Sequence, residues 1–304
     1  MKRTAPNLIA NPRRRQLLQA AGFTPVASLL GPVLANAQAG AVLPLDTPGL
    51  DHLDIIVEDA EAAARFYMAL FNTRLHAQPF QGAQRYFVLL GDMNDKREVG
   101  YLAIGAANGR GNYIGHFCTS VANWRRDSDA IWAGMTSAIA AAGLGDFAGP
   151  TGFGGIFDDP DGIEIQFLPS PDTLVTAAVP SDLVPANAGA IFPLGVDYVH
   201  LHVTSLDQAL AWYRILYGQE SGRQGGQAWF DFPRSGTRLS LEQITTPDKL
   251  PGIARFGIKT RPFDRRVAAG VLLGNGATLL PAESTGNNVR FIDPFGITVE
   301  LNPG

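Results

Sequence analysis

The feature that most constrains the fold is a repeat inside the chain. Residues 49–71 are GLDHLDIIVEDAEAAARFYMALF and residues 195–217 are GVDYVHLHVTSLDQALAWYRILY. In both copies a glycine, an apolar residue and an aspartate precede a β-rich run, a polar turn and a helix with an aromatic pair. Residues 159–163 and 293–297 add a second anchor, an Asp-Pro-x-Gly-Ile turn before a last apolar strand. The repeat predicts two tandem copies of one α+β domain.

Each copy divides again into halves of the same kind. In the first copy the periodicity predicts strand, helix and strands, twice over, at residues 50–57, 59–71, 84–90, 99–104, 113–119, 127–142, 153–157 and 163–168. A stretch rich in Pro, Ala and Ser separates the copies and is typical of a linker. The predicted boundaries are a removable segment at 1–39, a first domain at 49–171, a linker at 172–194 and a second domain at 195–302.

The first 39 residues resemble a twin-arginine signal peptide. Arg13, Arg14 and Arg15 precede Gln-Leu-Leu, a mildly apolar run follows, and Ala37-Gln38-Ala39 offers small residues for cleavage. Glycines and prolines interrupt the run, which falls short of the ~20 apolar residues that a spanning helix needs. The resemblance implies a periplasmic or secreted protein that is exported already folded.

The mature charge and the cysteine content exclude some classes. Removing residues 1–39 takes away five basic residues and no acidic one, which changes the formal net charge from −4 to −9. An acidic surface argues against nucleic acid or an anionic membrane as partner. The only cysteine, Cys118, allows no internal disulfide, and we interpret it as a small buried hydrophobe.

A βαβββ unit that occurs twice per domain, with Asp-His in the first strand and Asp-Pro-Asp-Gly before the last, resembles the vicinal oxygen chelate superfamily. Its members include glyoxalases, bleomycin resistance proteins and extradiol ring-cleaving dioxygenases. The resemblance extends over almost all of residues 49–302. It implies an α+β fold of two tandem domains, each of paired βαβββ modules forming a cupped mixed sheet with helices outside. It specifies the fold better than the reaction.

The resemblance also implies one divalent metal ion in the first cup. His52 stands at the ligand position of the first strand, and His116 at the matching position of the second module. Gln166 stands where the family usually places a glutamate, and Glu164 lies two residues earlier on the same strand face. Either the Gln166 amide binds the ion, or Glu164 reaches it, or the ion is held weakly. Fe2+ is favoured, and two imidazoles also suit Mn2+, Ni2+ or Zn2+.

Three further residues are candidates for proton transfer near this cup, namely Tyr101, Tyr113 and His76. In the second copy Tyr198 replaces the first histidine, Phe256 the second, and Glu300 keeps the last-strand carboxylate. That pattern favours a non-catalytic partner domain. A displaced site there would use two histidines on the face of Tyr198 and a glutamate on an inner strand: His200, His202 and Glu242.

These features predict an exported, metal-dependent enzyme acting on a small substrate with two neighbouring oxygens. An extradiol-type ring-cleaving dioxygenase is favoured. The alternatives are a glyoxalase-like lyase or isomerase, and a small-molecule binding protein of the resistance type that is not an enzyme. The expected partner is a small-molecule substrate, with no nucleic acid and no membrane once the signal is removed, and the exposed sheet edges allow a homodimer.

Overall fold

The structure is a computed structural model that describes residues 42–91, 100–150, 155–170, 179–181, 183, 189–281 and 287–304. The expected signal segment at 1–39 lies outside the described residues, as does most of the predicted linker at 172–194. Residues Gly40–Gly304 form one compact unit with two eight-stranded sheets. None of the helices in the described part of the chain has the length and apolarity needed to cross a membrane.

The first sheet contains the first copy of the repeat. Its elements are β1 (Gly49–Val57), α1 (Ala60–Leu70), β2 (Leu75–Phe80), β3 (Ala83–Leu90), β4 (Gly100–Ala106), β5 (Tyr113–Ala122), α2 (Trp124–Ala141), β6 (Ile156–Asp158), β7 (Glu164–Ser170) and β8 (Val179–Pro180). The strand order is β6-β7-β5-β1-β4-β3-β2-β8. The first strands of the two modules, β1 and β5, pair antiparallel at the centre, whereas β1 with β4 and β5 with β7 are parallel.

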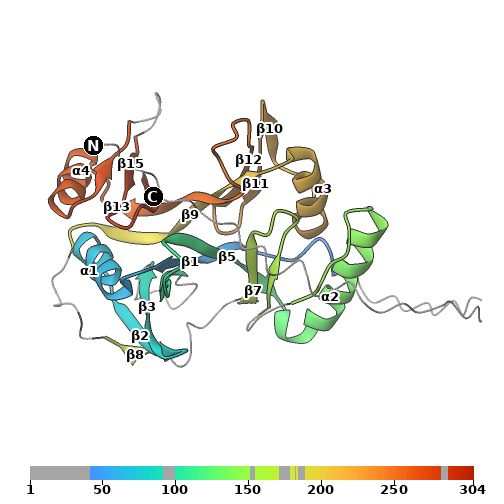
Figure 1. Cartoon of the computed structure of the whole chain (residues 1–304), viewed down its shortest axis with the longest axis horizontal. Coiled ribbons are helices and arrows are strands. Elements are labelled where there is room, and N and C mark those ends of the chain that lie inside the picture. The colour runs from blue at the N-terminus through green and yellow to red at the C-terminus, as the bar shows by residue number, and fades with distance from the viewer. Residues whose placement is uncertain are drawn as a thin grey trace, which may run out of the picture. The chain divides into compact units, whose positions relative to one another are not determined.

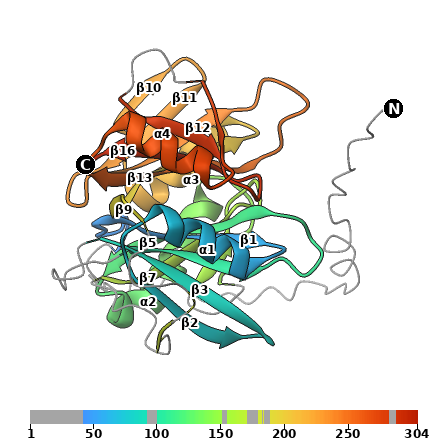
Figure 2. The ribbon, with the colours of Figure 1, turned by 90° about the vertical axis from the view of Figure 1, so that its left-hand side faces the viewer.

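The second sheet repeats this plan. Its elements are β9 (Phe192–Val203), α3 (Leu206–Tyr217), β10 (Gly222–Gln224), β11 (Gln227–Phe232), β12 (Thr237–Gln243), β13 (Gly252–Arg261), α4 (Arg265–Gly274), β14 (Thr278–Leu279), β15 (Val289–Ile292) and β16 (Thr298–Pro303). The order is β10-β11-β12-β9-β13-β16-β15-β14, with β9 and β13 antiparallel at the centre. Figures 1 and 2 show this sheet, yellow to red, above the blue and green elements of the first. The predicted α+β fold of two mixed sheets built from βαβββ-type modules is confirmed.

Equivalent caps start the first helix of each copy. The Asp59 carboxylate accepts a hydrogen bond from the Ala62 N–H (2.9 Å), and the Ser205 hydroxyl accepts one from the Gln208 N–H (3.4 Å). These are the acidic and Ser/Asp turns of the repeat, and they satisfy N–H groups that a helix start leaves without partners. The helix predicted at 127–142 begins three residues earlier, at Trp124.

Side-chain alternation gives each sheet two faces. In β1, Leu53 and Ile55 are fully buried in the core cluster that also contains the residues of α1. His52 and Asp54 therefore lie on the opposite face, which we call the cup face. A core cluster of this kind leaves the polar side chains of the central strands together on the cup face.

The two copies are joined by a reciprocal pair of hydrogen bonds. The hydroxyl of Tyr67 in α1 donates to Asp293 Oδ2 (2.8 Å), and the hydroxyl of Tyr213 in α3 donates to Asp159 Oδ2 (2.9 Å). The other oxygen of Asp159 accepts from the Asp161 and Ile163 N–H groups and so holds its own turn. In Figure 1, α1 accordingly lies on the side of α4 and β15, and α3 on the side of α2. The two anchors of the repeat thus bind each other across the copies.

This arrangement predicts a stability effect that depends on pH. Burial raises the pKa of Asp159 from 3.8 to about 6, against the hydrogen bonds from Ile163 and Tyr213. Because the folded state holds this proton more tightly than the unfolded state, the carboxyl lowers the free energy of unfolding as pH rises between these two values. Tyr213→Phe removes a donor that stabilises the anion. We expect a cost of about 1–3 kcal/mol at pH 8 and a smaller cost at pH 4.

Urea unfolding of Tyr213→Phe and the wild type at the two pH values measures this difference. Tyr113→Phe serves as the control, because its side chain is 38% exposed and we expect no comparable loss. An equal loss of stability in Tyr213→Phe at both pH values would contradict the role of Tyr213 in stabilising the Asp159 anion.

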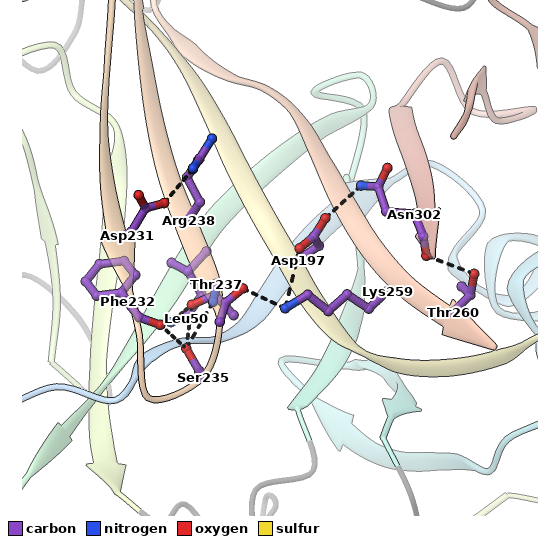
Figure 3. A network of polar contacts seen from close by, with 11 residues as sticks. Leu50, Asp197, Asp231, Phe232, Ser235, Thr237, Arg238, Lys259, Thr260 and Asn302 are labelled. Carbon is purple, nitrogen blue, oxygen red and sulfur yellow. Dashed lines mark hydrogen bonds and ion pairs between the residues drawn. The ribbon is translucent and has the colours of Figure 1, made fainter. Parts of the chain in front are cut away.

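A polar network holds the start of β1 against the second sheet (Figure 3). The Leu50 N–H donates to Thr237 Oγ1 (3.1 Å), and this oxygen lies 2.7 Å from Ser235 Oγ. On the neighbouring strands, Asp197 accepts a hydrogen bond from Asn302 Nδ2 (2.8 Å) and lies 3.6 Å from Lys259 Nζ. The start of β1, the central strand of the first copy, is therefore held by the β11–β12 hairpin of the second copy.

Candidate metal centre

A β-bulge at the start of β1 gives the site its first carboxylate. The pairing of β1 with β5 shifts register between Leu50 and Leu53, so one extra residue is accommodated there. Asp51 and His52 can then both contact groups of the cup face. Asp51 Oδ1 lies 2.7 Å from His52 Nδ1, and Asp51 Oδ2 accepts from the Ser120 hydroxyl (3.1 Å).

Two buried imidazoles face each other between β1 and β5. His52 Nε2 lies 3.3 Å from His116 Nε2, and the two side chains are 2% and 5% exposed. His116 Nδ1 lies 3.3 Å from Asp54 Oδ2, so a carboxylate accompanies the Nδ1 atom of each ring. A carboxylate accepts a hydrogen bond from Nδ1–H, and in the neutral ring Nε2 then carries a lone pair. Two lone pairs pointing at each other favour a cation between them.

The surrounding charges and burial maintain the protonation states that this pair of metal ligands needs. Burial lowers the pKa of His52, although Asp51 acts in the opposite direction, which keeps the ring neutral. Burial alone would raise the pKa of Asp54. The charge of Arg85, whose Nη2 lies 2.5 Å from Asp54 Oδ1, and the His116 contact outweigh burial and bring that pKa below its usual value. Asp54 is therefore an anion that orients His116.

The donor set fits a divalent transition-metal ion. Two nitrogen ligands about 2.0–2.1 Å from one metal lie roughly 2.8–3.4 Å apart, with the octahedral angle at the lower end and the tetrahedral angle at the upper end. The distance of 3.3 Å between the two Nε2 atoms falls in this range. In metal-binding histidines the second ring N–H commonly donates a hydrogen bond to a carboxylate. His52 Nδ1 has such a partner in Asp51, and His116 Nδ1 has one in Asp54. The residues present therefore fit such an ion.

Both candidates for the third ligand lie on the cup face of β7. Glu164 pairs with His116 in the sheet, and Gln166 pairs with Cys118 one step further along. Gln166 is buried, whereas Glu164 is partly exposed and lines a cavity. Cys118 also belongs to this environment, because its sulfur lies within 4.8 Å of ligand atoms of Asp51 and His52. The two candidates thus differ in their surroundings, with Gln166 in the buried interior and Glu164 at the cavity.

The predicted proton-transfer residues lie at different distances from this pair. Tyr101 stacks on the His52 ring, with centroids 4.2 Å apart and planes 14° from parallel, and so fixes that ring. Tyr113 lies at the end of β5 and lines a cavity of about 440 Å3 together with Glu164. His76 belongs to β2, three strands from β1, which is about 14 Å away at normal strand spacing. Tyr113 faces the cavity, Tyr101 supports a ligand, and His76 is distant.

The cavity adjoins the imidazole pair without being lined by it. Its walls come from both sheets, at residues 112–115, 162–164, 250–254 and 296–298. Gly115 and Glu164 lie beside His116 in sequence and in the sheet, respectively. Burial raises the pKa of Tyr113, with Arg110 acting in the opposite direction and Glu164 adding to the rise, so its hydroxyl keeps its proton at neutral pH. The cavity therefore brings a proton donor and a carboxylate to one wall.

The second sheet has different residues at the corresponding places. The alignment that put Phe256 opposite His116 is wrong, because Phe256 pairs with Val199 and lies fully in the core. Arg255, which pairs with His200, takes the position that His116 takes opposite Asp54. The pairing of β1 with β5 has register shifts at the equivalent places, so the two copies share one pairing and Arg255 corresponds to His116.

The remaining positions in the second sheet are occupied by paired charges. Glu300, the counterpart of Gln166, lies 2.9 Å from Arg290 Nη2 and accepts a hydrogen bond from Asn288 (3.0 Å). Burial and then Glu300 raise the pKa of Tyr198, the counterpart of His52, so its hydroxyl stays neutral. With Arg255 beside them, these groups satisfy one another and offer no lone pairs converging on a cation.

The carboxylate beside His52 gives a testable prediction. Asp51→Asn keeps the shape but removes the charge and replaces one acceptor oxygen by an amide NH2 group, so we expect the first-site metal to bind about 10–100-fold more weakly. Competition with a chelating dye measures this affinity. Asp197→Asn is the matched control, because Asp197 occupies the same place in the second copy and contacts Lys259 and Asn302 instead. A similar loss in both variants would rule out a specific role for Asp51.

The carboxylates and the cysteine of this site were not predicted from the sequence. Asp51 and Asp54 flank His52 at positions −1 and +2, and this spacing was the available signal. Arg85 and Cys118 carried no such signal, since only the order of strands places β5 beside β1 and β3 two strands away from it.

Comparison with known proteins bears on this arrangement. Residues 49–167 match the model of the Glyoxalase/Bleomycin resistance protein/Dioxygenase superfamily. The comparison with curated proteins gives no match. The 2,3-dioxygenase LapB from Pseudomonas sp. KL28 has a similar fold, with a TM-score of 0.57, 15% identity, and coverage of 84% of this chain and 91% of that chain.

Two further solved structures have a similar fold. The Mn(II)-bound glyoxalase from Novosphingobium aromaticivorans gives a TM-score of 0.56 and 18% identity, with 84% of this chain and 81% of that chain covered. BphC, a halotolerant catechol dioxygenase, gives a TM-score of 0.55 and 13% identity, with 85% of this chain and 87% of that chain covered. At these identities the likeness shows the fold alone. The family-model match over residues 49–167 and this shared fold together support the Glyoxalase/Bleomycin resistance protein/Dioxygenase superfamily.

Proposed function

We propose that the protein is a divalent-metal enzyme that acts on a small molecule with two neighbouring oxygens, and that it cleaves a catechol-type ring. One observation carries the proposal. The Nε2 atoms of His52 and His116 face each other at 3.3 Å while a carboxylate accompanies each Nδ1. Similar folds in the dioxygenases LapB and BphC support the choice of reaction class. Fe2+ is the favoured ion, because iron oxygenases use two histidines with one oxygen ligand.

The residues around the ion would have separate roles in the reaction. The bound ion would supply Lewis-acid and dioxygen chemistry at two substrate oxygens. Asp51 and Asp54 hold the imidazoles, and Tyr101 stacks on His52 to restrict its rotation. The cavity of about 440 Å3 has room for one aromatic ring. Tyr113 in its wall would donate a proton to the reacting substrate.

The proposed reaction balances without another reductant. Both atoms of dioxygen are added across one carbon–carbon bond of the catechol ring, and that bond breaks. Ring and dioxygen together account for every atom of the opened product.

The experiment combines metal analysis with two assays. The wild type is expected to contain about one iron in the first sheet, to consume dioxygen with catechol, and to lose activity when the iron is oxidised. Activity without dioxygen, supported by Mn2+, Ni2+ or Zn2+, would instead establish the glyoxalase-like lyase or isomerase. Ligand binding that survives both chelation and His52→Ala would leave a small-molecule binding protein and overturn the enzyme proposal.

We also propose that the enzyme works outside the cytoplasm. The Arg-Arg-x-Leu-Leu pattern and the small residues at Ala37-Gln38-Ala39 support this location. N-terminal sequencing of the periplasmic fraction is expected to give a chain that begins near residue 40, and recovery of the intact chain only from the cytoplasm would refute export.

A further inference from the structure

Two imidazoles and a carboxylate gather in the second sheet, away from the counterpart of the first site. His200 and His202 are two residues apart on β9 and share one face of the sheet. Glu242 on the neighbouring parallel strand β12 pairs directly with His202. The three side chains therefore come from two adjacent strands of one rigid sheet.

The ligand atoms of this cluster already lie close together. His200 Nε2 is 3.1 Å from Glu242 Oε2, and the ligand atoms of all three residues lie within 4.8 Å of one another. The two rings stand almost perpendicular, with centroids 5.7 Å apart. Ligands about 2.0–2.2 Å from a shared metal lie roughly 3–4 Å apart. His200 and Glu242 meet this requirement, and a ring nitrogen of His202 lies within 4.8 Å of both ligand atoms.

The cluster does not occupy the position of the first metal centre. The pairing of β9 with β12 matches that of β1 with β4, which makes His200 the counterpart of Asp54 and His202 the counterpart of Ile56. Two residues along a strand span about 6.6 Å. The cluster is thus displaced along β9 from Tyr198, the counterpart of His52.

The charged groups around the cluster decide which ions it can take. Lys249 Nζ lies 3.2 Å from Glu242 Oε1, Gln227 donates to Glu242 Oε2 (2.9 Å), and Arg255 pairs with His200 across β9 and β13. Lys249 is 40% exposed, so an arriving cation can displace it into solvent. With a single carboxylate and two nearby cations, the cluster disfavours Ca2+ and Mg2+, which need several oxygen ligands. Ions with high affinity for imidazole remain.

We propose that His200, His202 and Glu242 form a second metal site, for a late first-row transition ion such as Zn2+ or Ni2+. The inference does not depend on the activity of the first sheet. His202 and Glu242 are partly exposed, which leaves a coordination position for water.

Titration of the chelator-treated protein with Co2+, followed by visible absorption, tests the proposal. The wild type is expected to take up two equivalents, and His202→Ala and Glu242→Gln one each. Both changes affect partly exposed side chains, so the core stays intact. His52→Ala is expected to keep the second-sheet equivalent. His76→Ala, which alters a histidine outside both clusters, is expected to keep two.

Two results would overturn the proposal. One is a wild-type uptake of a single equivalent that disappears in His52→Ala. The other is a titration of His202→Ala and Glu242→Gln that cannot be distinguished from that of the wild type. Failure of the first site gives a different pattern, because His202→Ala and Glu242→Gln would then abolish all uptake while His52→Ala changed nothing.

Discussion

Replacing His116 with alanine is expected to remove the metal from the first sheet and to lower kcat/KM by about 10^3-fold or more, because the ion's contribution of several kcal/mol is lost. The change leaves His52 and the two carboxylates in place but removes one of the two facing lone pairs. His52→Ala should have the same effect. Metal content by elemental analysis and initial rates with the substrate class under test measure both quantities.

Changes on β7 identify the third ligand in the same assays. If the Gln166 amide binds the ion, Gln166→Glu adds a negative charge to the site and should raise metal affinity by about tenfold or more, since a carboxylate replaces a neutral amide beside a cation. Glu164→Gln is the matched opposite change, two residues earlier on the same face. It should leave metal content unchanged and affect only rates, through the cavity wall.

The reverse pattern assigns the ligand to Glu164. Loss of metal in Glu164→Gln, with no effect of Gln166→Ala, would contradict binding through the amide. Full metal content in both His52→Ala and His116→Ala would exclude the imidazole pair altogether.

Gly49→Ala is expected to lower the free energy of unfolding by roughly 2–6 kcal/mol, the largest stability effect that we predict for a single methyl group. Gly49 has a φ of 139°, a backbone conformation that strains residues with a side chain. A Cβ there would lie 2.5 Å from Thr237 Oγ1, 2.8 Å from Phe232 Cβ and closer still to Ser235 Oγ. It would therefore push the β11–β12 hairpin away from β1 and break the contacts of Figure 3.

Urea unfolding monitored by tryptophan fluorescence measures this loss. Gly82→Ala is the matched control, because Gly82 also has a positive φ, 81°, but no heavy atom lies within 4 Å of its added Cβ. We expect the control to cost about 1–2 kcal/mol, from backbone strain alone. Equal costs for the two variants would mean that the hairpin does not press on β1.

The repeat predicted the fold well, because each copy carries its own start signals. Asp59 and Ser205 cap equivalent helices, and Gly143 follows α2. Local propensity and hydrophobic pattern act over a few residues, and the sequence records both directly.

The site was only partly predictable, since bulges decide its details. A bulge brings Asp51 to the His52 ring, and the strand pairing puts Arg255, and not Phe256, at the second copy's counterpart of His116. A shift of one residue reverses the face of every side chain that follows it, and nothing in the local composition marks these shifts. The contact between Arg85 and Asp54 depends on strand order, which is set by the whole fold.

The exchanged bonds of Tyr67 with Asp293 and of Tyr213 with Asp159 have the symmetry of a two-fold dimer contact. Each copy gives a tyrosine and receives one at equivalent places, as identical subunits do in an isologous interface. A single-copy ancestor could have formed the same two bonds by self-association, before gene duplication joined the subunits in one chain. Separately expressed halves of this protein should accordingly recombine into a heterodimer, each half providing the donor for the other's buried acid.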